Sequence, residues 1–244
     1  MTAALEITNL VKMFGGLTAT NDLSFVLEPG ESVGLIGPNG AGKTTVFSQI
    51  MGELRQTSGK IKLFGTDIGA LSMPERIRRG VSRTYQVPRP FADLSVLENI
   101  RVGFMPNSVW GMVAARPDVG QERDLALEVG FNSADLEKPA SDLSMGDLRK
   151  LELARTLATG AKVLLLDEVF AGLTVGEIAQ ISALIQKLRT QGITMLMVSH
   201  DLPALDPLVD RVIAIERGSM IAKGSFAEVI ANEEVRASYL GVSA

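Results

Sequence analysis

Hydrophobic patterns predict strands at both ends of this chain. Apolar and polar residues alternate in several early segments, as they do in a strand with one buried face. These are residues 5–11, 23–27 and 59–64. Residues 163–166 are continuously apolar, which is typical of a strand buried on both faces of a parallel sheet. Residues 32–36 and 193–198 are further short apolar strands. Residues 211–222 predict a hairpin around Gly218.

Apolar residues at helical spacing predict the helices. The segments are residues 44–52, 120–129, 146–158 and 175–189. Another helix is expected to begin near Leu94, after a stretch rich in Arg and Pro. The middle of the chain therefore predicts a helical insertion, and the strands before and after it are expected to share one sheet. No internal repeat is visible.

The amino-acid composition excludes several classes of function. The chain has 244 residues, 46% hydrophobic and 21% charged, and its net charge is −4. That sign argues against a surface that coats nucleic acid, so we expect no nucleic-acid partner. With Cys 0 and His 1, a disulfide framework, a thiolate nucleophile and a multi-histidine metal site are excluded.

No segment predicts a membrane span, although the mean hydropathy is +0.21. The longest uncharged stretch, residues 102–115, contains Pro106, Asn107 and Gly111 and is shorter than the roughly 20 apolar residues that a span needs. The N-terminus lacks the basic and apolar regions of a secretory signal. We therefore expect the chain to stay in the cytoplasm.

A glycine-rich loop connects the strand predicted at 32–36 with the helix at 44–52, and it fits G-x-x-x-x-G-K-[ST]. Glycines let backbone N–H groups close around phosphate oxygens at a helix N-terminus. Lys43 is expected to meet the β- and γ-phosphates, and the Thr44 hydroxyl to bind Mg²⁺. The predicted nucleotide-binding residues are Gly37, Pro38, Asn39, Gly40, Ala41, Gly42, Lys43, Thr44 and Thr45. This chain is therefore predicted to bind a nucleoside triphosphate.

An acidic pair, Asp167 and Glu168, follows the apolar run at 163–166. Beside such a loop, Asp167 is expected to hold Mg²⁺, directly or through water, and Glu168 to orient and deprotonate an attacking water. The alternative is a solvated acidic pair that begins a loop. The two motifs predict a P-loop ATPase or GTPase without choosing among kinases, GTPases, helicases and transport ATPases.

Residues 143–147, with the sequence LSMGD, resemble the LSGGQ signature of the ATP-binding cassette (ABC) family. Ser144 and Gly146 stand at the matching serine and second glycine, whereas Met145 and Asp147 depart from the pattern. Alone, the segment also fits an ordinary N-cap at Ser144. Its place one helix upstream of the acidic pair favours the signature.

Three more residues follow the order of the ABC family. Gln86 resembles the glutamine that senses Mg²⁺ and water and faces the membrane partner, and His200 resembles the switch histidine that contacts the γ-phosphate. Phe14 resembles the aromatic residue on which adenine stacks. Taken singly, Gln86 also fits a surface glutamine, His200 a histidine that starts a helix, and Phe14 a phenylalanine of the core. Together with the P-loop, they extend the resemblance over nearly the whole chain.

Further patterns look like the ATP-binding subunits of branched-chain, or hydrophobic, amino acid importers. They lie at residues 12–17, 79–86, 89–91, 94–100 and 171–173. Related ABC systems for urea or amide import and for lipopolysaccharide export are alternatives. So are a soluble ABC ATPase acting on ribosomes or DNA, and a P-loop kinase in which Ser144, Gln86 and His200 would have no role.

The resemblance implies an α/β fold in one cassette domain. Its P-loop NTPase core has a mostly parallel sheet, with an N-terminal antiparallel β subdomain and an inserted α-helical subdomain. The nucleotide-binding core would comprise residues 1–86 and 160–222, the helical subdomain residues 87–159 and a C-terminal helical extension residues 223–244.

The resemblance also implies function: ATP hydrolysis with Mg²⁺ that powers amino acid import. The implied catalytic residues are Glu168, His200, Lys43 and Gln86, and the implied metal-binding residues are Thr44, Gln86 and Asp167. Ser144 and Gly146 would complete the ATP site of a second chain, in a homodimer or heterodimer. Transmembrane permease subunits would hold the chain at the inner face of the plasma membrane and link it indirectly to a periplasmic solute-binding protein.

Departures from the family pattern limit these expectations. Val169 replaces a proline, and Thr174 replaces the Asp or Asn that caps the D-loop, the segment that couples the two ATP sites. Thr can still cap a helix, so the local structure should persist. An excess of Arg around the predicted membrane-facing segment fits either a solvated face or a contact with a permease loop. These residues are Arg76, Arg78, Arg79, Arg83 and Arg89.

Overall fold

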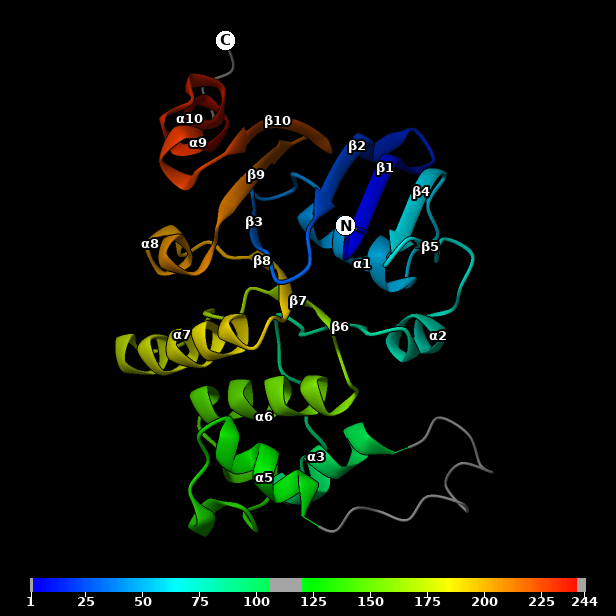
Figure 1. The fold of residues 1–244 in the computed structure, drawn as a ribbon. Coiled ribbons are helices and arrows are strands. Elements are labelled where there is room, and N and C mark those ends of the chain that lie inside the picture. Colours follow the sequence, from blue (N-terminus) through cyan, green and yellow to red (C-terminus); the bar gives the residue numbers. More distant parts are fainter. Residues whose placement is uncertain (1, 106–119, 241–244) are drawn as a thin grey trace.

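The computed structural model describes residues 2–105 and 120–240, which form two sheets with helices around them (Figure 1). The first sheet is antiparallel, in the order β2-β1-β4-β5. Its strands are β1 (Leu5–Phe14), β2 (Leu17–Leu27), β4 (Ser58–Leu63) and β5 (Thr66–Asp67). β1 and β2 are longer than predicted because register shifts between Ile7 and Met13 interrupt the alternation that marks a strand in the sequence.

The second sheet has the order β10-β9-β3-β8-β7-β6 and is parallel except for β10. Its strands are β3 (Ser32–Ile36), β6 (Val81–Arg83), β7 (Val163–Asp167), β8 (Thr194–Val198), β9 (Arg211–Glu216) and β10 (Ser219–Gly224). Because β3 pairs with β8 and β9, strands from before and after the helical insertion share one sheet, as predicted.

Helices cover both sheets and form a separate group below them in Figure 1. That group comprises α3 (Val96–Phe104), α5 (Gln121–Glu128) and α6 (Met145–Ala158), with short turns η1 (Ser133–Asp135) and η2 (Ala140–Asp142). The others are α1 (Lys43–Met51), α2 (Met73–Arg78), α7 (Val175–Thr190), α8 (Leu202–Leu205), η3 (Asp206–Leu208), α9 (Phe226–Ala231) and α10 (Glu233–Leu240). The predicted fold class, with its antiparallel sheet and inserted helices, is confirmed.

Within the two described ranges, no helix combines the length and apolar character needed to cross a bilayer. Most of the uncharged stretch at 102–115 lies outside the described residues.

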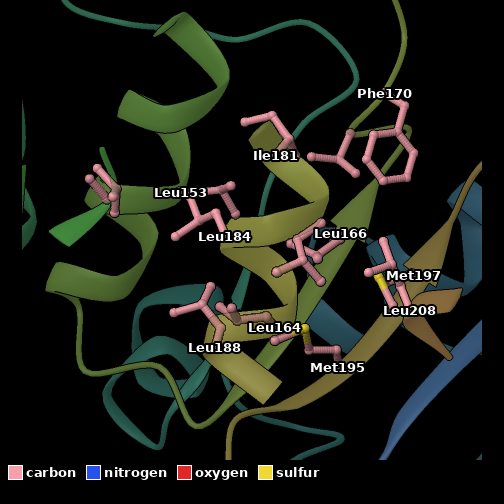
Figure 2. Packing of buried hydrophobic residues seen from close by; sticks show 14 of the residues in the cluster. Leu153, Leu164, Leu166, Phe170, Ile181, Leu184, Leu188, Met195, Met197 and Leu208 are labelled. Carbon is pink, nitrogen blue, oxygen red and sulfur yellow. The ribbon is translucent and has the colours of Figure 1, made fainter. Parts of the chain in front are cut away.

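The second sheet is buried on both faces, which explains its continuously apolar strands. In β7, Leu164 and Leu166 belong to one hydrophobic cluster, and Val163 and Leu165 belong to the other. Figure 2 shows Leu164 and Leu166 beside Ile181, Leu184 and Leu188 of α7. The second cluster joins the opposite face to α1 and the antiparallel sheet. β7 therefore emerges from the centre of the molecule, and it delivers the acidic pair at its end.

Arg76 does not belong to a solvated basic face. It is 1% exposed, and its guanidinium donates to the carbonyls of Gln49, Ile50, Gly69 and Leu71. These bonds fasten α2 to the end of α1 and satisfy carbonyls that the helix leaves without a partner.

Candidate functional site

The P-loop has a backbone that only glycine tolerates at two positions. Gly37 has φ +153 and Gly42 has φ +106. A Cβ at Gly37 would collide with the carbonyl oxygen of Ile215, and one at Gly42 with that of Ala19. Gly42 is also the N-cap of α1 and supplies no side-chain cap. The first N–H groups of α1 therefore face the loop without a capping side chain, as an anion site requires.

Lys43 is folded back onto this loop. Its Nζ donates to the carbonyls of Gly37 at 2.7 Å and Pro38 at 3.0 Å. Burial lowers the pKa of Lys43, and the charges of Glu168 and Asp167 partly oppose that shift. Both hydrogen-bond partners are neutral, so a phosphate oxygen would be a stronger acceptor for the ammonium group.

Most of the predicted site residues line one cavity of about 590 Å³, within the size range of ligand sites, whereas Gly37, Pro38 and Asp167 are not among its lining residues. Those that line it are Phe14, Asn39, Gly40, Ala41, Gly42, Lys43, Thr44, Thr45, Gln86, Glu168 and His200. Asp167 ends β7 beside Glu168. Among the described residues, Ser144 and Gly146 do not line this cavity; they lie at the start of α6.

Phe14 lies at the end of β1 and is 45% exposed, so its ring is accessible from the cavity. The Nζ of Lys12 lies 4.9 Å from the ring centroid. Phe25, the other aromatic residue nearby in the sequence, is buried in the core. Of the two, only Phe14 is placed where a base could stack.

Glu168 and His200 contact each other directly. His200 Nε2 lies 3.2 Å from Glu168 Oε1, and the backbone N–H of His200 donates to Oε2 at 3.2 Å. Glu168 has φ +50, a left-handed conformation that is uncommon for a non-glycine residue, and its N–H donates to the carbonyl of Val198. Such backbone strain concentrates at functional sites, and here it aims a carboxylate at the cavity.

Asp167 is held by a buried arginine. Arg83 Nη2 lies 2.6 Å from Asp167 Oδ2, and its Nη1 donates to Glu53 Oε2 at 2.9 Å and Ser48 Oγ at 3.0 Å. The N–H of Asp167 donates to Thr84 Oγ1. The strand β6 and the helix α1 thus fix the orientation of this carboxylate, and Arg83 neutralises its charge within the core.

The predicted signature and the D-loop share one carboxylate. Glu177 Oε1 accepts the N–H of Gly146 at 2.9 Å, and its Oε2 accepts the N–H and the hydroxyl of Thr174. Bonds from Thr174, led by its N–H, lower the pKa of Glu177. Thr174 caps α7, as expected, and Ser144 caps α6 by accepting the N–H of Asp147. The starts of the two helices are therefore tied together.

Gln86 is exposed at the cavity, and its backbone is held by α6. Arg149, which is 1% exposed, donates to the carbonyls of Gln86, Tyr85 and Glu168 and pairs with Glu152. One guanidinium therefore connects the helix that follows the signature with both the Gln86 segment and the acidic pair.

A second groove, of about 310 Å³, lies beside the Gln86 segment. Its lining includes Tyr85, Arg89, Glu152 and Arg155 together with apolar residues. Phe91, which is 47% exposed, packs near it, with the Arg155 guanidinium 4.8 Å from its ring centroid.

Several residues that contact the predicted site were missed from the sequence, among them Arg149, Glu177 and Tyr239. Glu177 had a visible signal, since Thr174 followed three residues later by Glu is a capping-box pattern. Arg149 looked like one more charge on an amphipathic helix. Tyr239 contacts Gly37 from the other end of the chain, and no local pattern indicates such a pairing.

Comparison with known proteins agrees with this arrangement. Residues 20–171 match the family model described as ABC transporter. The chain is 34% identical to two high-affinity branched-chain amino acid transport ATP-binding proteins, BraF of Pseudomonas aeruginosa and LivG of Escherichia coli, over 97% of its length and 97% of theirs. The ADP conformation of MJ1267, an ATP-binding cassette of an ABC transporter, shares its fold with a TM-score of 0.88 and 26% identity, over 99% of this chain and 100% of that one. The chain therefore belongs to the ABC transporter family, as one of its ATP-binding and ATP-hydrolysing subunits.

Proposed function

We propose that this chain powers the import of branched-chain or other hydrophobic amino acids. The observation that carries the ATPase mechanism is the convergence of Lys43, Glu168 and His200 on one cavity at the P-loop. The choice of solute rests on the likeness, along nearly the whole chain, to BraF and LivG, which are named for branched-chain amino acid transport.

In the proposed mechanism, each group around the cavity has one task. Adenine stacks on Phe14, and N–H groups of the P-loop hold the phosphates. Lys43 exchanges the carbonyls of Gly37 and Pro38 for the β- and γ-phosphates. Glu168 accepts a proton from the water that attacks the γ-phosphorus, and His200 donates a hydrogen bond to the γ-phosphate. The bond between the γ-phosphorus and the β–γ bridging oxygen breaks as the bond to water forms, which releases ADP and inorganic phosphate.

The residues present fit Mg²⁺ as the cofactor. Thr44, Gln86 and Asp167 offer oxygen ligands of the kind that Mg²⁺ prefers, and Arg83 occupies only Oδ2 of Asp167 in the contact described above. No cluster of three or more acidic, His or Cys side chains forms a ready cage within residues 2–105 and 120–240. Phosphate oxygens and water would complete the coordination, and the metal would offset the charge of the phosphates.

We further propose that two chains act together, in a homodimer or heterodimer. Support comes from Ser144 and Gly146, which lie outside the lining of the cavity described here and would close over the nucleotide of a second chain. The groove at Tyr85, Arg89 and Arg155 is the proposed seat of a permease segment. That contact would hold the chain at the inner face of the plasma membrane and connect it indirectly with a periplasmic solute-binding protein.

The proposed division of the cassette follows the same logic. Residues 1–86 and 160–222 would act as the nucleotide-binding core, residues 87–159 as the helical subdomain and residues 223–244 as the C-terminal extension. The packing of α3, α5 and α6 on one another supports the boundaries proposed for the helical subdomain (Figure 1).

The Glu168→Gln variant tests the proposed general base. Gln keeps the size of the side chain but cannot accept the proton, so turnover should fall about 10²–10⁴-fold while ATP still binds. Steady-state phosphate release measures turnover, and gel filtration with ATP should detect an accumulated dimer. Lys43→Ala is the companion variant, and its affinity for ATP in calorimetry should fall. Near wild-type hydrolysis by Glu168→Gln would overturn the assignment of the base.

The solute is tested separately. Disrupting the gene should abolish uptake of radiolabelled leucine by intact cells and leave urea uptake unchanged. Loss of urea uptake with leucine uptake intact would assign the chain to the other import system.

A further inference from the structure

The C-terminal helix reaches the P-loop through one tyrosine. The Tyr239 hydroxyl accepts the backbone N–H of Gly37, the first residue of the loop, at 2.8 Å. The two residues lie at opposite ends of the sequence, and α10 brings them together. This contact satisfies a backbone donor that no strand partner uses in the hydrogen bonds described for β3 and the loop.

Gly37 connects Tyr239 with Lys43, because its peptide groups bond to both side chains. Its backbone conformation, φ +153, is one that glycine adopts readily but other residues do not. The carbonyl of Gly37 accepts the ammonium of Lys43. Tyr239 therefore holds the same residue whose carbonyl positions the phosphate-binding lysine.

Tyr239 is carried by an anchored helix. Val235, one turn earlier in α10, is 1% exposed and belongs to the larger hydrophobic cluster. The side chain of Asn232 accepts the N–H of Val235 at the start of the helix, and α9 before it has a complete capping box at Ser225 and Glu228. Figure 1 shows α9 and α10 side by side next to β10. The hydroxyl is thus delivered from a packed element.

The Tyr239 hydroxyl also interacts electrostatically with Glu168. Burial raises the pKa of Tyr239, the bond from Gly37 lowers it in part, and the charge of Glu168 raises it further. The phenol therefore stays neutral, and it lies within electrostatic reach of the carboxylate that faces the cavity.

We propose that Tyr239 is a positioning residue for ATP hydrolysis: by holding the N–H of Gly37, the C-terminal helix keeps the P-loop and Lys43 arranged to receive the phosphates. The inference rests on the ATPase function given above. Because the contact exists before nucleotide arrives and supports ground state and transition state alike, its loss should weaken binding more than it slows the chemical step.

Tyr239→Phe in the full chain tests the proposal, since it removes the hydroxyl and keeps the ring. The dissociation constant for ATP with Mg²⁺, from calorimetry, should rise about 2–10-fold, the range for one neutral hydrogen bond. The KM for ATP should rise by a similar factor while kcat changes less than about twofold. Ser238→Ala is the matched control, because it removes a hydroxyl from the same helix that donates to the carbonyl of Val235.

A spectroscopic measurement can follow Tyr239 while its hydrogen bond with Gly37 is still present. The chain has Tyr 2, so labelling with 3-fluorotyrosine gives two ¹⁹F resonances. Tyr85→Phe or Tyr239→Phe assigns them, and the Tyr239 resonance should shift when ATP and Mg²⁺ are added. Equal affinities of Tyr239→Phe and Ser238→Ala, or a Tyr239 resonance that stays unmoved at saturating ATP, would overturn the proposal. An unchanged affinity of Lys43→Ala would instead contradict the nucleotide site itself.

Discussion

At the scale of single residues, buried charge is the main organising feature of the site. Arg83 and Asp167 are both nearly inaccessible to solvent, and each would be costly to bury alone. Glu53, which is partly exposed, also pairs with Arg83 and accepts the hydroxyl of Tyr85 at 2.9 Å. Arg83, which orients the proposed metal-binding carboxylate of Asp167, is therefore connected through Glu53 with Tyr85 in the second groove.

Arg83→Met tests the cost of breaking this buried pair. Met fills a similar volume but leaves Asp167 without its cation, so the free energy of unfolding should fall by about 3–5 kcal/mol. Urea denaturation measures the change. Arg217→Met is the control, because the Arg217 side chain is 83% exposed and its ion-pair distance is 3.9 Å. Equal stabilities of the two variants would show that the Arg83 pair contributes nothing net.

Residue identity alone predicted much of the site but not its supports. The P-loop, Asp167, Glu168, Gln86 and His200 carry family patterns because the chemistry of phosphate binding restricts those side chains. Arg83 was visible only as one member of a basic stretch, since burial depends on the neighbouring elements and not on local sequence. Tyr239 was not visible at all, because its partner lies at the other end of the chain.

At the scale of elements, three helices place their N-termini at predicted site residues. The N-terminus of α1 faces the P-loop, and those of α6 and α7 are tied by Glu177. β6 and α2 were not predicted as elements because they span three and six residues, too few for a periodic pattern to show. The apolar strands β3, β7 and β8 were predicted closely because both faces of the second sheet are covered there.

Thr174→Ala should weaken the start of α7. Loss of an N-cap side chain costs about 0.5–2 kcal/mol of the free energy of unfolding. Because hydrogen bonds lower the pKa of Glu177 in the folded protein, its contribution is present at neutral pH and is lost as the pH falls through that lowered value. The difference between variant and wild type in urea denaturation should therefore shrink on acidification.

Thr190→Ala is the control for that experiment, since Thr190 lies at the other end of α7 and its hydroxyl donates to the carbonyl of Lys187. A difference between Thr174→Ala and wild type that stays constant with pH would contradict the role of Glu177 in the cap.

Leu166→Ala should destabilise the centre of the second sheet. Leu166 is fully buried between β7 and α7 (Figure 2), and truncation of such a leucine costs about 2–5 kcal/mol. Leu127→Ala provides the comparison, because Leu127 is 42% exposed on α5 and should lose far less. Thermal and urea unfolding of both variants measure the difference; similar losses would place Leu166 outside the well-packed core.

At the scale of the whole molecule, the candidate nucleotide cavity and the proposed docking groove meet at the Gln86 segment. The nucleotide cavity is lined by Gln86 itself, and the second groove is lined by Tyr85, the residue before it. Arg149 holds the carbonyls of both residues from α6. A displacement of this short segment would therefore alter both the cavity and the groove, which suits the proposed coupling of ATP hydrolysis to a permease.

Arg89→Glu tests the second surface. Reversing the charge in the groove should weaken recovery of the chain with its permease subunits in co-purification, while ATP hydrolysis by the isolated subunit stays unchanged. Arg78→Glu, at the C-terminal end of α2 and absent from the lining of the groove among the described residues, is the control. Normal permease recovery with Arg89→Glu would move the docking site elsewhere.

The order of strands in the second sheet also determines when the molecule can form during synthesis. β3, which ends at Ile36, lies between β8 and β9, which begin at Thr194 and Arg211. A ribosome releases β3 long before either neighbour, so the nascent chain carries an unpaired apolar strand until β8 and β9 have been synthesised. Fragments cut before residue 194 should consequently depend on chaperones or aggregate, because β3 lacks both of its neighbouring strands in them.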